Sequence, residues 1–221
     1  MKALQLIAPS SFDLVDLPVP EPADGEVLVQ VKACGICGSD IHGMNGSSGR
    51  RIPPIVMGHE ASGVVTKAGA GVTGWQAGDR LTFDSTIYCG ECDYCRSGHV
   101  NLCENREVLG VSCDEFRRQG AFAEYVLVPA RVCHRLPADL SFDEAAFAEP
   151  VSVALHAVSR LRLAPGESAL VVGAGLIGLL IVQALKRAGC EKIIAVDLAD
   201  ERLSLARELG ATDVVNSSTP G

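Results

Sequence analysis

Apolar and polar residues alternate over several short stretches of the first 140 residues, and Gly, Pro and Asp interrupt these stretches. The alternation has a period of two at residues 27–31, 79–83 and 121–128. This period is typical of β-strands with one buried face, because successive side chains point to opposite faces of a sheet. We therefore predict an all-β region up to about residue 140.

The pattern changes to helical spacing after residue 142. Residues 142–161 contain few helix breakers apart from Pro150. Two strand–helix units follow, with strands predicted at 169–172, 192–196 and 213–215 and helices at 176–188 and 200–209. Strands and helices that alternate in this order form a parallel α/β sheet. The boundary is expected between residues 150 and 166, and we assign residues 1–155 and 156–221 to the two domains.

The predicted parallel sheet is incomplete. Its third strand ends a few residues before Gly221. A dinucleotide-binding fold has two mononucleotide-binding halves and usually six strands. We therefore expect that the sequence is truncated within this domain.

Composition and charge exclude several classes of partner. The 221 residues include 19 Lys plus Arg and 27 Asp plus Glu, which gives a net charge of −8, and no basic run offsets it. Nucleic acids and anionic membranes are therefore not expected as partners.

The uncharged stretch 168–185 is of marginal length for a bilayer and contains three glycines, so a buried strand, turn and helix explain it better. Nine cysteines, an odd number, and an N-terminus without a signal sequence favour a reducing, cytoplasmic compartment.

Four cysteines lie within fifteen residues, in a loop rich in Gly, Asp and Asn. They have the spacing C-x2-C-x2-C-x7-C and are Cys89, Cys92, Cys95 and Cys103. Four thiolates at this spacing match a closed, tetrahedral zinc site of the structural kind. An iron–sulfur loop and a set of free surface thiols are the alternatives.

A second set of metal-binding residue types is spread along the β region. It consists of Cys34 and Cys37, then His59 and Glu60, and finally Glu149. Thiolate, imidazole and carboxylate together form the mixed donor set of catalytic zinc sites, which keep one coordination position open. The two cysteines alone could equally form a zinc knuckle or be small core residues.

Two further residues lie close to Cys37 in the sequence. Ser39 and His42 follow it by two and five residues. At this spacing they could pass a proton outward from a hydroxyl group at the metal.

A glycine-rich motif lies between the first predicted strand of the α/β region and the helix that follows. It reads Gly173-Ala174-Gly175-Leu176-Ile177-Gly178, and Asp197 ends the next strand. In this context the motif predicts a dinucleotide site, with the pyrophosphate at the helix N-terminus and Asp197 accepting from the ribose hydroxyls. The carboxylate would repel a 2′-phosphate, so NAD is expected rather than NADP. A glycine motif that only serves helix packing is the alternative.

With these motifs together, the sequence resembles the zinc-containing medium-chain dehydrogenases, which include alcohol, sorbitol and threonine dehydrogenases. The similarity extends over essentially all 221 residues, through segments such as GEVLVQVKACGICGSDIH, MGHEASGVV, GAFAEYVLVPA, EPVSVALHA and VVGAGLIGLL. The resemblance implies a GroES-like β-barrel catalytic domain followed by a Rossmann domain. It also implies two zinc ions per chain and transfer of a hydride from an alcohol to NAD.

The resemblance implies roles for individual residues. Cys37 and His59 would bind the catalytic zinc, and Asp40 would hold His59. Cys34 has no ligand role in this pattern, whereas Ser39 and His42 would form the proton relay. The EPVSVALHA segment is similar to the polyol branch (sorbitol, galactitol phosphate) and the threonine branch, in which the carboxylate of Glu149 or that of Glu60 would complete the zinc site.

The sequence is compatible with several hypotheses of function. The first is an oxidoreductase that acts on a secondary alcohol, such as a polyol, a sugar-alcohol phosphate or an amino alcohol. The others are a zinc-free quinone or enoyl reductase on the same scaffold, a non-enzymatic zinc module, and an incomplete fragment that binds zinc and NAD weakly. Homo-oligomerisation is expected for the full-length protein.

Overall fold

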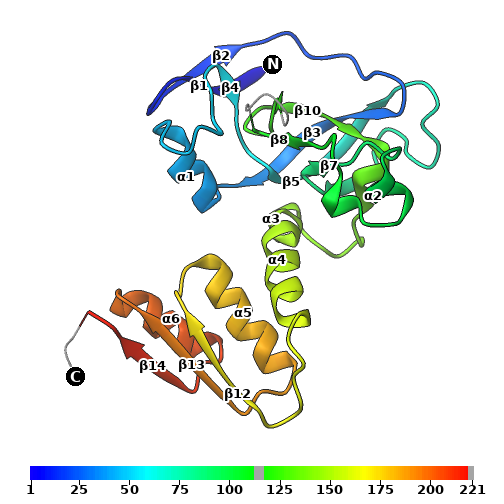
Figure 1. Ribbon diagram of the computed structural model, residues 1–221. Coiled ribbons are helices and arrows are strands. Elements are labelled where there is room, and N and C mark those ends of the chain that lie inside the picture. The colour runs from blue at the N-terminus through cyan, green and yellow to red at the C-terminus, as the bar shows by residue number, and fades with distance from the viewer. Residues whose placement is uncertain (112–116, 219–221) are drawn as a thin grey trace. The chain divides into compact units, whose positions relative to one another are not determined.

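The computed structural model describes residues 1–111 and 117–218, and its contacts divide the chain into two compact units (Figure 1). The units are Met1–Glu149 and Pro150–Gly221. Each contains its own cluster of buried apolar side chains. The boundary assigned from the sequence, between residues 155 and 156, lies inside a helix that begins at Ala148.

Short strands dominate the first unit, as the alternating pattern predicted. In the described part of this unit, the sheets have the strand orders β2-β1-β4, β10-β3-β5-β6-β11 and β7-β8-β9. The strands are β1 (Lys2–Ala8), β2 (Ser11–Asp16), β3 (Glu26–Gly35), β4 (Ile55–Val56), β5 (Glu60–Ala68), β6 (Arg80–Phe83), β7 (Thr86–Ile87), β8 (Glu107–Leu109), β9 (Arg117–Arg118), β10 (Tyr125–Pro129) and β11 (Cys133–Arg135).

Short helices connect these strands. They are α1 (Gly38–Met44), α2 (Asp93–Arg96), the 3-10 turns η1 (Val100–Leu102) and η3 (Ala130–Val132), and α3 (Phe142–Ala146). Ser141 caps α3, because its Oγ accepts from the Glu144 amide at 3.2 Å while the Glu144 carboxylate accepts from the Ser141 amide at 2.9 Å. The α3 helix contacts β3, β5 and β6, and so covers part of the largest sheet.

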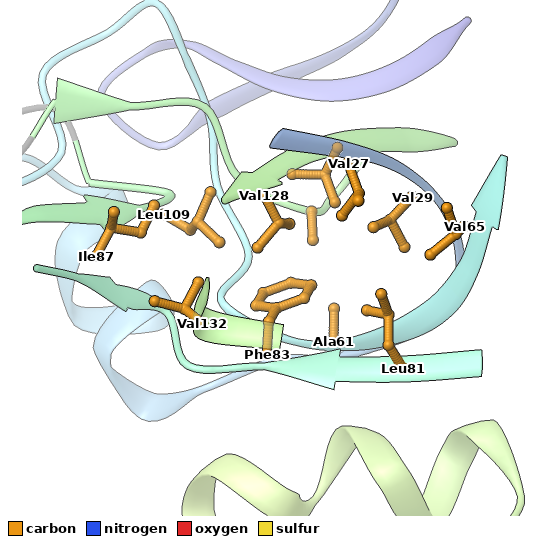
Figure 2. Close-up of a cluster of buried hydrophobic side chains, with 12 residues drawn as sticks. Val27, Val29, Ala61, Val65, Leu81, Phe83, Ile87, Leu109, Val128 and Val132 are labelled. Carbon is orange, nitrogen blue, oxygen red and sulfur yellow. The ribbon is translucent and has the colours of Figure 1, made fainter. Parts of the chain in front are cut away.

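The core of the first unit is shown in Figure 2. Its side chains come from β3, β5, β6, β7, β8 and β10, from the η3 turn, and from Ala121 in the loop before β10. The residues labelled there are Val27, Val29, Ala61, Val65, Leu81, Phe83, Ile87, Leu109, Val128 and Val132. Mostly branched aliphatic side chains surround one Phe ring, which is the packing that stabilises a small β-domain.

Two predicted elements differ in the structure. Residues 121–128 do not form one strand, since β10 begins only at Tyr125. The preceding amides bond elsewhere: Ala121 donates to the Gly58 carbonyl and Phe122 to that of Met57. The predicted helical stretch is divided at Phe147 into α3 and α4 (Ala148–Ser159), and Pro150 lies in the first turn of α4, where a missing amide costs little.

The second unit has the predicted α/β order. After α4 come β12 (Ser168–Val172), α5 (Leu176–Arg187), β13 (Lys192–Asp197), α6 (Asp200–Leu209) and β14 (Asp213–Asn216). The strands pair in parallel in the order β12-β13-β14, which is visible in Figure 1. The prediction of a parallel sheet is therefore confirmed.

The α5 and α6 helices contact each other as well as the sheet, so both lie on the same face. On β12, Val171 points to this covered face and is buried, whereas Leu170 and Val172 are 62% and 78% exposed. The uncharged stretch 168–185 forms β12, a turn and most of α5. Within residues 1–111 and 117–218, no helix combines the length and apolar character needed to cross a membrane.

Candidate functional site

The four-cysteine loop brings its sulfurs together. One sulfur each from Cys89, Cys92, Cys95 and Cys103 lies within 4.8 Å of the other three. The Cys89 and Cys95 sulfurs are 3.9 Å apart. A tetrahedral zinc ion with Zn–S bonds of about 2.3 Å holds its sulfurs about 3.8 Å apart. The spacing of the thiols therefore fits a zinc ion.

Backbone amides in this loop favour the thiolate form of Cys89. The Glu91 and Cys92 amides donate to the Cys89 sulfur at 3.5 and 3.4 Å, and they lower the pKa of that thiol to about 6. Burial raises the pKa of Cys95 to about 12. Cys95 is therefore not a thiolate at neutral pH unless a cation compensates its charge, which is the chemistry of a structural metal site.

A second cluster lies at one end of the largest sheet. One donor atom each of Cys37, His59 and Glu60 lies within 4.8 Å of the other two. Cys37 immediately precedes α1, which follows β3, and Glu60 is the first residue of β5. The pairing of β3 with β5 places Gly35 opposite Glu60, and this pairing brings the two sequence segments together.

The glycine at the cross-strand position leaves room for the Glu60 carboxylate. Glu60 is 3% exposed, and a Cβ atom at position 35 would lie 2.4 Å from its Oε2. A buried carboxylate needs a charged or hydrogen-bonding partner to offset its desolvation. A cation shared with Cys37 and His59 meets this need, so the donor set and its burial fit Zn²⁺.

Asp40 contacts two residues of this cluster, Cys37 and His59. It is 2% exposed, and its Oδ2 accepts from the Cys37 amide at 3.2 Å. Its Oδ1 lies 3.5 Å from Nδ1 of His59 and 3.4 Å from Nη2 of Arg51. The other imidazole nitrogen, Nε2, is the one left for a metal, and the carboxylate fixes the orientation of the ring.

His59 has a strongly shifted pKa. Burial alone would lower it, but the nearby Asp40 carboxylate and the Cys37 sulfur favour the protonated ring and raise the pKa to about 10. A metal binds neutral imidazole, so metal binding at this cluster is expected to depend on pH.

The remaining predicted residues lie on a pocket beside this cluster. The pocket has a volume of about 660 Å³, and His59, Ser39, His42 and Glu149 all line it. Burial raises the pKa of Glu149, and so do the charges of Glu60 and Asp84, whereas His59 lowers it. Glu149 is not in the group of donors that lie within 4.8 Å of one another, and in this respect the two candidate carboxylates differ.

Cys34 lies apart from the donor group. It is within β3, opposite Ala61 of β5. Burial, followed by the charges of Asp40 and Glu60, raises its pKa to about 12, so the group stays a neutral thiol. Arg51, by contrast, contacts the site although no pattern in the sequence pointed to it. It is 5% exposed, and its Nη2 is also 3.5 Å from Oγ of Ser39.

The glycine motif forms the turn between β12 and α5. Gly173 has a φ of +95°, and Gly175 is the N-cap of α5. A Cβ atom at Gly178 would lie 1.8 Å from the Gly173 carbonyl oxygen, so α5 and the turn can approach only with glycine there. Leu176 and Ile177 begin the helix. The arrangement presents free amides at a helix N-terminus, as an anion site requires.

Asp197 ends β13 and contacts this turn. Its Oδ2 accepts from the Ala174 amide at 2.7 Å, and its Oδ1 accepts from the Leu198 and Ala199 amides at 2.8 and 3.0 Å. These bonds lower the pKa of the carboxyl. The carboxylate therefore fixes the turn; Oδ1 already accepts two hydrogen bonds, whereas Oδ2 accepts one and has a second lone pair for a further donor.

Comparison with protein families gives two matches. The alcohol dehydrogenase GroES-like domain matches residues 23–138, and the zinc-binding dehydrogenase domain matches residues 177–220. The first match covers more than half of the chain and contains both the four-cysteine loop and the Cys37, His59 and Glu60 cluster. The second begins inside the glycine motif.

Individual relatives match almost all of the chain. D-xylulose reductase A of Aspergillus oryzae is 39% identical over 92% of the chain and 57% of its own length. L-threonine 3-dehydrogenase of Shewanella frigidimarina is 38% identical over 99% of the chain and 64% of its own length. The crystal structure of an alcohol dehydrogenase from Escherichia coli CFT073, complexed with NADH, has a TM-score of 0.89 at 37% identity and covers 100% of this chain and 64% of that one. The chain thus spans less than two thirds of each relative.

Proposed function

The chain belongs to the zinc-binding alcohol dehydrogenase family with a GroES-like domain, and from this premise we propose that it contains the catalytic site of an NAD-dependent dehydrogenase acting on a secondary alcohol. The observation that carries the proposal is the Cys37, His59 and Glu60 cluster, which adjoins a pocket of about 660 Å³. A polyol, a sugar-alcohol phosphate or an amino alcohol is the substrate class. The donor sets of both clusters disfavour a zinc-free reductase.

The side chains have distinct roles in this proposal. A zinc ion held by Cys37, His59 and one carboxylate would supply Lewis-acid polarisation of the substrate hydroxyl, and NAD would accept the hydride. Glu60 is favoured as the third ligand because its carboxylate lies within 4.8 Å of the other two donors. Glu149 lines the same pocket, where it would orient the substrate or replace Glu60.

Ser39 and His42 carry the proton. Both are in α1 and line the pocket, at positions separated by less than one helical turn. Ser39 Oγ accepts the proton of the substrate hydroxyl as it gives its own proton to His42, and His42 releases a proton to solvent, to which its side chain is exposed. Asp40 orients the His59 ring. Arg51 contacts both Asp40 and Ser39 and so keeps Ser39 in position.

The second unit binds the nicotinamide cofactor. The amides at Gly175, Leu176 and Ile177 meet the pyrophosphate, and Gly173 and Gly178 shape the turn. Asp197 accepts from the ribose hydroxyls and disfavours a 2′-phosphate, which supports NAD over NADP. Assembly of the whole protein into a homo-oligomer and a cytoplasmic location stay predictions from the sequence.

Metal analysis tests the proposal first. We expect two zinc ions per chain, of which a mild chelator removes one together with alcohol oxidation, because the mixed site has an open coordination position and the four-cysteine site is closed. Turnover is measured as NADH absorbance with a panel of polyols and amino alcohols, using the complete gene product. No more than one zinc in well-folded protein, or no oxidation of any alcohol, would contradict the proposal.

Two substitutions in the glycine motif separate folding from cofactor binding. Gly178→Ala is expected to destabilise the second unit by about 2 kcal/mol or more, because its Cβ would overlap the Gly173 carbonyl. Gly175→Ala has open space around its Cβ, so it should leave stability within about 1 kcal/mol while weakening NAD binding, since the methyl group meets the pyrophosphate. Thermal unfolding and NAD titration measure the two effects. NAD affinity that is unchanged in Gly175→Ala would show that the turn does not contact the cofactor.

A further inference from the structure

The Arg51 side chain packs directly against α1. It belongs to the loop before β4 and is 5% exposed. A Cβ atom at Gly43 of α1 would lie 2.6 Å from Cγ of Arg51. Gly43 has the backbone of a helical residue, so the absence of a side chain there matters for space rather than for φ. Glycine at position 43 therefore gives the arginine its path to the cluster.

The guanidinium of Arg51 makes three long polar contacts. Its Nη2 lies 3.4 Å from Oδ1 of Asp40 and 3.5 Å from Oγ of Ser39. Its Nη1 donates to the Arg50 carbonyl at 3.5 Å. Within residues 1–111 and 117–218, its buried Nε has no hydrogen-bond partner. A buried donor without a partner lowers stability, and apolar residues in place of a buried ion pair are often no less stable. The contacts of Nη2 are therefore what an arginine adds at this position.

The contact with Arg51 restricts the hydrogen bonds of the Ser39 hydroxyl. A hydroxyl has one donor hydrogen and two acceptor lone pairs, whereas a guanidinium only donates. Ser39 Oγ therefore accepts from Arg51, and its own hydrogen points elsewhere. At 3.5 Å this bond is long, but catalytic hydrogen bonds commonly shorten once a substrate is bound. One lone pair of Oγ stays available for the substrate.

Two acceptors are candidates for the Ser39 hydrogen. His42 follows Ser39 by three residues, so both lie on one face of α1, and both line the pocket. The Asp40 carboxylate is the other candidate, because its Oδ1 and the Ser39 Oγ lie within 3.5 Å of the same Nη2. A carboxylate binds a hydroxyl hydrogen strongly. A hydrogen held by Asp40 is not available to His42.

We propose that Arg51 is a positioning residue of the proton relay, which donates to both Ser39 Oγ and Asp40 and so directs the Ser39 hydrogen to His42. The inference rests on the proposed function, because it concerns the relay of that site. As the substrate O–H bond breaks, its proton bonds to Ser39 Oγ, and the original Ser39 proton bonds to His42. Arg51 keeps its protons throughout.

Steady-state kinetics of the zinc-loaded complete gene product test this, with the panel alcohol that is oxidised fastest. Arg51→Met should lower kcat by about ten- to a hundred-fold and change KM by less than about three-fold, because substrate still binds but its proton leaves slowly. The solvent deuterium isotope effect on kcat should rise, since proton transfer then limits turnover. Arg51→Lys, which also only donates, should recover part of the loss.

A double-mutant cycle with Ser39→Ala separates this role from support of the zinc cluster. Without the hydroxyl, Arg51→Met should slow turnover by less than about a further two-fold, because the hydrogen that Arg51 directs is absent. If Arg51 acts through Asp40 and His59 instead, its replacement costs the same factor in both backgrounds. That result, or an unchanged kcat in Arg51→Met, overturns the inference. Zinc content is measured for every variant.

A second substitution displaces Arg51 without removing its charge. Gly43→Ala places a methyl group 2.6 Å from the Arg51 side chain, whereas a Cβ at Gly38 of the same helix meets nothing within 4 Å. Gly43→Ala should lower kcat and keep both zinc ions, and Gly38→Ala, the matched control, should leave kcat unchanged. If Arg51→Met loses zinc, Gly43→Ala decides the outcome, and a kcat equal to that of Gly38→Ala overturns the inference.

Failure of this inference is distinguishable from failure of the proposed function. If the unsubstituted protein binds two zinc ions and oxidises an alcohol, but the Arg51 and Gly43 variants keep its kcat, only the role of Arg51 is wrong. If the unsubstituted protein oxidises no alcohol and its mixed site holds no zinc, the proposed function is wrong, and the inference about its relay is overturned with it.

Discussion

Replacement of Cys37 by serine is expected to lower kcat/KM for alcohol oxidation by at least about a thousand-fold, because a Lewis acid contributes several kcal/mol of transition-state stabilisation and this variant loses one of its ligands. The zinc content should fall from two ions per chain to one. The free energy of unfolding should change little, because Cys37 lies outside the buried core cluster, at the N-cap of α1. Metal analysis, NADH absorbance and urea unfolding measure the three quantities.

Cys34→Ser is the matched control for this variant. The two thiols are three residues apart, but Cys34 is not in the donor group of Cys37, His59 and Glu60. Its replacement should keep both zinc ions and most of the activity. The assignment of Cys37 would be wrong if its serine variant still binds two zinc ions, or if Cys34→Ser loses as much activity.

Cys103→Ser is expected to have the largest effect on stability, with a loss of more than about 3 kcal/mol in the free energy of unfolding of the first unit. Cys103 is fully buried, and its sulfur accepts from the Cys89 amide at 3.2 Å. Since metal binding at a four-thiolate site is coupled to the folding of its loop, loss of one ligand removes much of that binding free energy. Urea unfolding followed by far-UV circular dichroism, with zinc analysis, measures the effect.

The control for this variant is Cys133→Ser in β11. This thiol also packs against the core of the first unit but belongs to neither donor group. Its replacement should cost about 1 kcal/mol and leave the zinc content unchanged. Similar losses from both variants would show that the four-cysteine loop contributes packing rather than a metal site.

Local patterns predicted much of the fold. In the second unit, the helix predicted at residues 200–209 has those same bounds in the structure, and the strands at 169–172 and 192–196 differ by one residue at an end. Such elements are determined by hydrophobic periodicity and by glycines at turns, and both are properties of neighbouring residues. The four-cysteine cluster is local in the same sense, because its ligands lie within fifteen residues.

Non-local contacts decided the features that the sequence patterns missed. Residues 121 and 122 alternate like a strand, but their amides bond to Met57 and Gly58, more than sixty residues earlier in the chain. A strand pattern specifies which side chains can be buried and not which backbone will pair with them, since pairing depends on tertiary context.

The sequence by itself determined the residue types of the second cluster, through Cys37, His59 and two candidate carboxylates. Only the tertiary structure distinguished those carboxylates, because the pairing of β3 with β5 sets Glu60 opposite Gly35 and beside the other donors, while Glu149 lines the pocket. The tertiary structure also places Arg51 beside Asp40, and it sets Arg50, Arg51 and Arg106 around one pocket. The physical reason is that the interaction energy of buried charged groups depends on the distance between them in space. The order of residues along the chain does not specify that distance.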